Sequence, residues 1–307
     1  MKMLPPVATR FALAASLTAA AAGIGCAQIL GAQFDEATQG EPDSSADGAS
    51  HPLDASIDAQ PFDPRSVDHL ELWLAADYGI SVSGLDAGDA IDGQSSPLDG
   101  VALWEDRSGK GHTAVGVDPQ RRPVVVRDAG PSPVVSFNRA QQTCLTDTWV
   151  SPIGVPSALT FFVVSQGDAT NVLRFGTLGA IAFPWDSNYS HLDGNEPQLR
   201  LLVAPSAGAR EMPLLGSDAR VWELLSARLV ARDVGGLRSY RNGQLSEQAS
   251  LTNADLPSLD ALTIGCVGLV DEFATALVGE VLVYTAALSD ADRLRVEDYL
   301  RTKWRLY

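Results

Sequence analysis

The chain has 307 residues and a net charge of −16, from 38 acidic and 22 basic residues. Its basic residues form no run that could follow a phosphate backbone, so nucleic acid is excluded as a partner. The same acidity argues against direct docking on anionic lipid headgroups. No G-x-x-x-x-G-K-[ST] loop occurs in the sequence, so no nucleotide is expected.

An uncharged, alanine-rich segment, Phe11 to Gly25, follows a short basic start. Its length is typical of a secretory signal rather than of a membrane span. It ends in Gly23-Ile24-Gly25-Cys26, which resembles a bacterial lipoprotein signal, whose cysteine receives the lipid. We predict a lipoprotein-type signal peptide over residues 1–26 with lipid attachment at Cys26. The alternative is an ordinary signal peptide cleaved near Cys26.

Residues 27–68 are predicted to be an acidic, disordered tether. From Ala32 to Asp68 the chain carries nine acidic residues and one base, and few large apolar side chains. Such a segment buries too little surface to offset its ordering entropy, and its like charges keep it extended. The domain would then be extracytoplasmic, anchored to the bacterial outer membrane or cell surface through the lipid alone.

With Cys26 lipidated, two cysteines remain, Cys144 and Cys266. Outside the cytoplasm they could form a disulfide, which would close a loop of more than 100 residues. Two buried free thiols that pack as small apolar side chains are the alternative. The pairing cannot be decided from the sequence.

Residues 69–307 are predicted to form one domain of many short strands. Leu159 to Val164 is a continuous apolar run, as expected for a strand covered on both faces. Asn242-Gly243 lies between two short strands and supplies the positive φ angles of a tight hairpin turn. Turn signals recur along the whole domain, which favours a sandwich of two sheets.

A helix is predicted at the C-terminus, ending at Trp304. Ser289 can cap its first turn, where acidic residues favour the positive end of the helix dipole. We expect an apolar face to lie on the outside of a sheet. That face comprises Leu288, Ala291, Leu294, Val296, Leu300 and Trp304.

Several segments, in this order, resemble the concanavalin A-like lectin/glucanase superfamily, in its bacterial laminin-G-like branch. The resemblance implies an all-β, two-sheet antiparallel jelly-roll sandwich with a short C-terminal α-helix. The matching segments are Leu72–Asp77, Trp104–His112, Pro133–Leu145, Phe161–Val164, Tyr240–Gly243, Leu262–Gly265, Gly279–Tyr284 and Ala287–Trp304.

The enzymes of that superfamily use carboxylates in an E-x-D-x-x-E pattern, which places them on one face of a strand. The pattern is absent from this sequence, and Glu280 stands alone on its strand, where a solvent-facing or edge position is expected. Asp106, Ser108 and His112 could be drawn as a triad, but a structural role in a glycine-rich turn is favoured. The histidines have no zinc-ligand spacing. No catalytic residue is therefore predicted.

One segment, residues 183–196, combines aromatic rings with planar polar groups, the chemistry of a sugar-binding site. It also carries enough oxygen ligands for calcium, although it lacks an EF-hand pattern. The alternative is an acidic hairpin loop with Trp185 packed inward. The candidate ligand residues are Trp185, Asp186, Asn188, Tyr189, Asp193, Asn195 and Glu196.

The sequence thus favours a non-catalytic binding module on a bacterial lipoprotein that recognises carbohydrate or a surface protein. One alternative is a carbohydrate-active enzyme, such as a glycoside hydrolase, on the same fold. The other is a structural envelope or adhesion protein without a small ligand. Fold analogy alone does not decide among the three.

Overall fold

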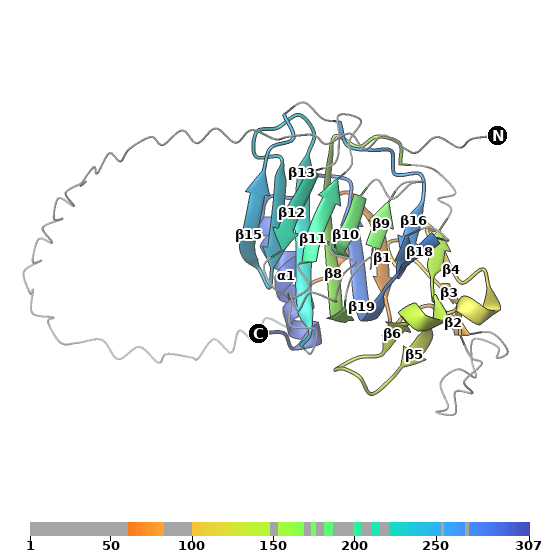
Figure 1. The fold of residues 1–307 in the computed structure, drawn as a ribbon. Coiled ribbons are helices and arrows are strands. Elements are labelled where there is room, and N and C mark those ends of the chain that lie inside the picture. The colour runs from red at the N-terminus through yellow and green to blue at the C-terminus, as the bar shows by residue number, and fades with distance from the viewer. Residues whose placement is uncertain are drawn as a thin grey trace, which may run out of the picture. The chain divides into compact units, whose positions relative to one another are not determined.

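A computed structural model of the chain describes residues 61–82, 100–147, 153–168, 173–175, 181–186, 199–203, 210–214, 221–252, 255–267 and 270–307. These residues form two antiparallel sheets packed face to face and one C-terminal helix, α1 (Figure 1). The predicted two-sheet jelly-roll sandwich with a short terminal helix is confirmed. The signal segment with Cys26 and the acidic segment up to residue 60 lie outside the described residues.

Sheet 1 has the order β15-β14-β13-β8-β19-β6-β5, and β1 pairs with β19 beside β6. Its strands are β1 (Leu70–Ala75), β5 (Val124–Val126), β6 (Val134–Phe137), β8 (Ala158–Asp168), β13 (Glu223–Val230), β14 (Leu237–Arg241), β15 (Gln244–Ala249) and β19 (Thr275–Tyr284). The long strands β8 and β19 pair over most of their length and form the centre of the sheet.

Sheet 2 has the order β12-β11-β10-β9-β16-β7-β4-β3-β2. Its strands are β2 (Ile80–Val82), β3 (Val101–Trp104), β4 (Ala114–Val115), β7 (Leu145–Asp147), β9 (Leu173–Phe175), β10 (Ile181–Asp186), β11 (Leu199–Val203), β12 (Arg210–Leu214) and β16 (Leu262–Ile264). A separate small ribbon pairs β17 (Cys266–Val267) with β18 (Val270–Phe273). Short 3₁₀ turns occupy Pro64–Ser66, Pro119–Arg121 and Arg139–Gln141.

Strand β8 separates two hydrophobic cores, because its side chains alternate between the faces of sheet 1. Phe161 and Val163 join the core between the two sheets, together with Trp104 of β3. Phe162 and Val164 join the core between sheet 1 and α1. All four β8 side chains are fully buried, which confirms that the apolar run at Leu159–Val164 is covered on both sides.

Helix α1 (Asp290–Trp304) covers the outer face of sheet 1, on the side away from sheet 2 (Figure 1). Its first turn is capped as predicted: the Ser289 hydroxyl accepts a hydrogen bond from the Asp292 amide. The predicted apolar face is only partly right, since Leu294 is 51% exposed and Ala291 is also exposed. Their predicted places facing the sheet are taken by charged residues.

Arg293 and Glu297 lie on the buried face of α1 together with Val296, Leu300 and Trp304. They occupy it as a pair, since the Arg293 guanidinium donates to both Glu297 oxygens at 2.7 Å. The Ser226 hydroxyl of β13 donates to the same carboxylate at 2.9 Å. Burial raises the pKa of the Glu297 carboxyl, and the Arg293 charge opposes that rise. A search for apolar residues alone does not find this face of the helix, because two charged side chains can be buried there when they pair with each other.

The Glu280 carboxylate of sheet 1 also joins α1 to the sheet. Glu280 is fully buried on β19, so the expected solvent-facing or edge position is wrong. One of its oxygens accepts from the Trp73 indole at 2.6 Å and from the Tyr299 hydroxyl at 2.9 Å. The other accepts from the Trp304 indole at 2.9 Å and lies 2.9 Å from the Lys303 ammonium. These four donors satisfy a charge that would be costly to bury alone.

The folded region begins before residue 69. Phe62 packs against the core beneath α1, and Pro64 and Val67 are buried. The Tyr284 hydroxyl donates to the Pro64 carbonyl at 3.2 Å. Residues 61–68, which the sequence assigns to the acidic segment, are therefore packed on sheet 1 because Phe62, Pro64 and Val67 supply apolar anchors there.

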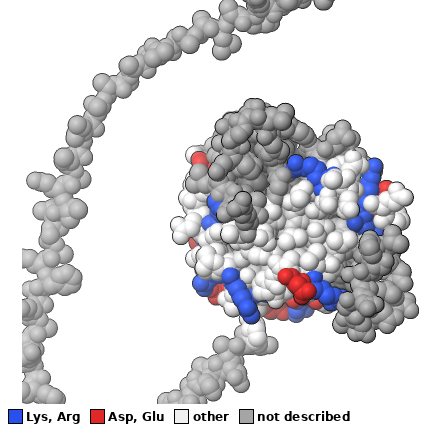
Figure 2. Space-filling view, turned by 60° about the horizontal axis from the view of Figure 1, so that its bottom comes forward, with Lys and Arg blue, Asp and Glu red and all other residues white. Residues whose placement is uncertain are grey.

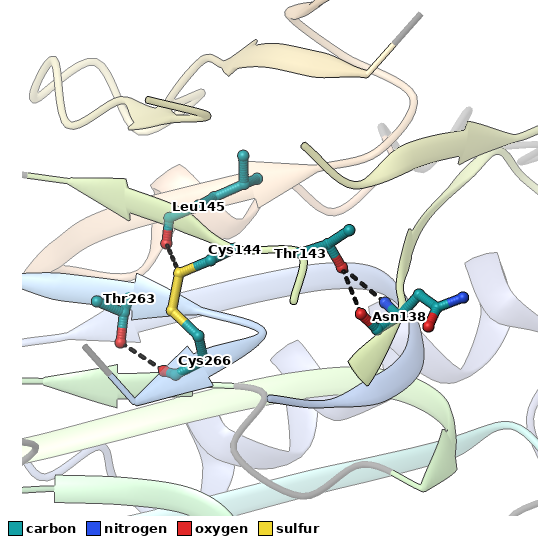
Figure 3. The surroundings of a disulfide bond; sticks show 6 residues. All are labelled: Asn138, Thr143, Cys144, Leu145, Thr263 and Cys266. Carbon is teal, nitrogen blue, oxygen red and sulfur yellow. Dashed lines mark hydrogen bonds between the residues drawn. A yellow bond between two sulfur atoms is a disulfide. The ribbon is translucent and has the colours of Figure 1, made fainter. Parts of the chain in front are cut away.

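Two local predictions concern turns and cysteines. Asn242 and Gly243 have φ angles of 51° and 78°, which confirms the tight hairpin between β14 and β15. Cys144 and Cys266 form a disulfide across 122 residues, between the start of β7 and the β17 ribbon (Figure 3). The disulfide links sheet 2 to the strand that follows Gly265, whose φ is 79°.

We expect Glu280→Gln to destabilise the protein by about 1.5–3 kcal/mol, because a neutral amide replaces a buried carboxylate that accepts several hydrogen bonds. Here the Lys303 ammonium keeps the Asp77 carboxylate, at 3.1 Å, and a neutral amide group faces two indole donors. Urea unfolding followed by tryptophan fluorescence measures the change. Glu247→Gln on the exposed side of β15 is the matched control and should cost less than about 0.5 kcal/mol. A Glu280→Gln protein as stable as this control would contradict the assigned role.

Candidate functional site

The predicted ligand segment connects two paired strands of sheet 2. Strands β10 and β11 are antiparallel neighbours, and Asp186 at the end of β10 pairs with Leu199 at the start of β11. Residues 187–198 are therefore the connection of this hairpin. Trp185 and Asp186 lie in β10 rather than in a loop. Asn188, Tyr189, Asp193, Asn195 and Glu196 fall outside the described residues.

The register of the β10–β11 pair shifts between Ala182 and Trp185. Pro184 lies within the shifted stretch. Proline has no backbone N–H to donate to a neighbouring strand, so it is tolerated where the regular pairing is already interrupted. Such an irregularity increases the local twist and re-aims the end of a strand. The candidate segment thus leaves sheet 2 directly after a shifted stretch of backbone.

Asp106 organises the glycine-rich segment that follows β3. One oxygen of its carboxylate accepts from the backbone amides of Trp73 at 2.9 Å and Ser108 at 2.8 Å. The other accepts from the Ser108 hydroxyl at 2.6 Å and from the Gly111 amide at 3.1 Å. Gly111 has a φ of 82°, which glycine adopts without strain. The predicted structural role of this segment is therefore what the geometry shows.

The triad of Asp106, Ser108 and His112 is not assembled. The Ser108 hydroxyl donates to Asp106 and to the Glu71 carbonyl, whereas the His112 ring contacts other carboxylates. His112 Nε2 lies 3.0 Å from the Glu71 carboxylate, and its Nδ1 lies 3.9 Å from Asp147. A buried acid–histidine cluster of Glu71, His112 and Asp147 thus joins β1 to β7.

The sequence pattern does not predict this acid–histidine cluster, since its members are far apart in the sequence. Asp147 is buried at the end of β7, and one of its carboxylate oxygens accepts no hydrogen bond. Burial raises the pKa of the Asp147 carboxyl to about 6, and the nearby Asp106 charge adds to the rise. The His112 ring and the Thr113 amide act in the opposite direction.

Three further carboxylates that are buried in the described part of the chain, those of Glu280, Glu297 and Glu223, have structural partners. Glu280 lies between sheet 1 and α1, and Glu297 is paired with Arg293 in the same layer. Glu223 of β13 forms an ion pair with Arg241 of β14. Glu280 and Glu297 lie under the helix layer, so they cannot act as a nucleophile and acid facing a bound glycan.

Charge and metal-ligating groups are dispersed over the described surface. On the face in Figure 2, both signs of charge lie around a broad uncharged area. Among the residues that the structure describes, no group of three His, Cys, Asp or Glu side chains could hold a metal ion. No helix within the described ranges is long and apolar enough to cross a membrane.

Neither the protein-family models nor the curated proteins give a match to this chain. Three solved β-sandwich domains share its fold. The binding domain of Paraclostridial Mosquitocidal Protein 1 superposes with a TM-score of 0.54 at 10% identity, over 79% of this chain and 56% of that one. The binding domain of botulinum neurotoxin DC gives 0.51 at 9% identity in two structures, with SialylT and with rat synaptotagmin II.

The third is domain 4 of AbnA, a GH43 extracellular arabinanase from Geobacillus stearothermophilus, in complex with arabinotriose. It superposes with a TM-score of 0.50 at 15% identity, over 75% of this chain and 97% of that domain. The chain spans about half the length of the toxin binding domains, namely 56% and 52%. At these identities the likeness shows a shared sandwich fold.

We expect Asp147→Asn to change how stability depends on pH. A carboxyl whose folded pKa lies near 6 binds its proton more tightly in the folded than in the unfolded state. Protonation of Asp147 therefore adds to the stability of the wild type as the pH falls from about 6 to 4, and the asparagine variant lacks this contribution. The stability of the variant minus that of the wild type should fall by at least about 1 kcal/mol from pH 7 to pH 4.

Urea unfolding at pH 4, 5, 6 and 7 measures this difference. Asp255→Asn is the control, because the salt bridge to Arg232 lowers the pKa of the Asp255 carboxyl. Its effect belongs below pH 4, where stability is lost as the carboxylate protonates. Parallel pH profiles for wild type and Asp147→Asn would show that burial does not perturb Asp147.

Proposed function

We propose that the chain is a non-catalytic carbohydrate-binding module displayed outside a bacterial cell on a lipoprotein. In this proposal it is a laminin-G-like member of the concanavalin A-like superfamily, and its ligand segment is the β10–β11 connection. The fold shared with the arabinotriose-bound domain 4 of AbnA carries the proposal, since that domain is matched over 97% of its length. That domain is part of an extracellular arabinanase and was solved with a bound oligosaccharide.

The chemistry of residues 183–196 supports this placement. An indole and a phenol can stack on the C–H face of a sugar ring, while carboxylate and amide groups bond its hydroxyls. The segment holds Trp185 and Tyr189 together with Asp193, Asn195 and Glu196. The same oxygen atoms are of the kind that calcium prefers, so we include calcium as a ligand of this segment.

The layer order supports display toward a ligand. The described chain enters at Pro61 on the α1 side of sheet 1, where Phe62 and Pro64 pack. The β10–β11 connection belongs to sheet 2, on the opposite side of the sandwich. Pro61 and the β10–β11 hairpin thus lie on opposite sides of the described sandwich.

A surface protein is the second candidate ligand. The toxin binding domain with the same fold was solved with rat synaptotagmin II as well as with SialylT. A sandwich of this kind can thus present loops to either class of partner. The two candidates differ in whether an isolated oligosaccharide is sufficient for binding.

We expect the full chain to bind a trisaccharide such as arabinotriose, cellotriose, chitotriose or sialyllactose, measured by isothermal titration calorimetry. Trp185→Ala should weaken that binding at least about tenfold, because stacking on a sugar ring is lost. Val234→Ala, at a position 76% exposed in the turn between β13 and β14, is the matched control. Chelation with EDTA should weaken binding if calcium orders the segment.

Incubation of the full chain with polysaccharides and with surface proteins distinguishes the alternatives. Release of reducing ends from a polysaccharide panel would overturn the non-catalytic proposal. Failure to bind any glycan, combined with capture of a defined surface protein that Trp185→Ala abolishes, would favour the protein ligand.

The lipid anchor has its own test. Cells that express the full chain are labelled with radioactive palmitate, and the protein should carry label that Cys26→Ser abolishes. Cys144→Ser should keep the label, because that cysteine lies inside the folded domain. Equal labelling of wild type and Cys26→Ser would contradict the lipoprotein proposal.

A further inference from the structure

A groove of about 590 Å³ runs between the N-terminal segment and α1. It is lined by Pro61, Phe62, Asp63, Ser66, Arg295 and Asp298. We propose that this groove is a second carbohydrate site that takes a neutral oligosaccharide. The proposal rests on the proposed function, and it places an additional site on the α1 side of the sandwich, away from the β10–β11 connection.

The groove has the size and composition of a sugar site. Ligand pockets commonly measure about 300–1,000 Å³, and this volume has room for roughly two or three sugar rings. Phe62 contributes an aromatic ring, half-buried beside Tyr299 at a centroid distance of 6.1 Å. The Arg295 guanidinium lies over the Phe62 ring, 4.9 Å from its centroid, so the ring and the planar donors form one stacked surface at the groove. Such a surface offers an aromatic edge and planar donors to the apolar and hydroxyl-bearing faces of a pyranose or furanose.

The charges that line the groove are balanced on their own elements. Asp63 binds the Arg65 guanidinium through both oxygens at 3.0 Å, and this bond lowers the pKa of the Asp63 carboxyl. Asp298 pairs with Arg301, and Arg295 lies 3.5 Å from Asp292. Because each charge already has a counter-charge, an ionic ligand gains little there.

A neutral polyol suits this arrangement better than an ion. Each carboxylate keeps lone pairs that can accept from sugar hydroxyls, and a guanidinium keeps donors beyond its ion pair. The side chains of Arg295 and Asp298 are 54% and 63% exposed, so a ligand in the groove can reach them. One sugar ring can therefore bond donors and acceptors from two walls at once.

The N-terminal wall of the groove is fixed before any ligand binds. The Asp63 carboxylate accepts from the Arg65 amide at 2.9 Å, and the Ser66 hydroxyl donates to the Asp63 carbonyl at 2.7 Å. Pro64 is buried beneath this turn, where its carbonyl accepts from Tyr284. A preformed wall reduces the entropy that must be lost on binding. This matters most for a ligand of modest affinity, such as a sugar.

The test titrates the full chain with arabinotriose, cellotriose and chitotriose, with sialyllactose as the anionic comparison. Binding is followed by calorimetry and by the side-chain Nε–H signal of Arg295 in NMR spectra. We expect a neutral trisaccharide to shift the Arg295 signal. Arg295→Ala and Asp298→Ala should each weaken that binding at least about tenfold. Leu294→Ala, exposed on the same helix but outside the groove, is the matched control and should leave binding unchanged.

We expect thermal melts to show that all three variants remain folded, since each changes an exposed side chain. Binding that survives Arg295→Ala and Asp298→Ala, with no shift of the Arg295 signal, would overturn the groove as a site. If Trp185→Ala abolishes that same binding, the proposed function stands without the groove. If no trisaccharide binds the wild type, both proposals are overturned.

Discussion

The helix layer depends on the buried Glu280 carboxylate. Its donors come from β1 and from the last two turns of α1, while Glu280 itself belongs to the central strand β19. Trp73 and Trp304 are therefore held by hydrogen bonds as well as by packing. Gly279 beside it makes room, because a Cβ at that position would lie 2.3 Å from the Trp304 ring. One charge thus sets where the helix lies along the sheet.

That constraint gives the sandwich two unequal sides. The outer face of sheet 1 is covered by α1 and by residues 61–67, which add a second hydrophobic core to the one between the sheets. In sheet 2 the cross-strand neighbours Val115 and Thr146 are partly exposed on the outer side. Binding residues are most useful on loops that a rigid scaffold positions, and β10 and β11 extend such a loop from sheet 2.

The sequence predicts the parts of this fold whose signals are local. The positive φ angles at Asn242-Gly243, the Ser289 cap and the apolar run of β8 each follow from neighbouring residues. The sequence does not predict the burial of Glu280, because a lone glutamate on a strand is expected to be exposed. One of its hydrogen-bond donors, Trp73, is 207 residues away. Pairing at that separation leaves no periodic pattern. The exposed Leu294 is predicted to face the sheet because it is apolar, whereas the charged pair Arg293–Glu297 lies on the buried face.

The candidate ligand residues show the complementary limit. Composition predicts a sugar site at residues 183–196 but does not point to the proposed groove beside Phe62. The groove is built from two segments separated by more than 200 residues, neither of which is aromatic-rich alone. The two proposed sites belong to opposite layers of the sandwich, so we do not expect a short oligosaccharide to bridge them. Gain from bivalency then requires a ligand that is itself polymeric or displayed in many copies, which is how glycans occur on cell surfaces.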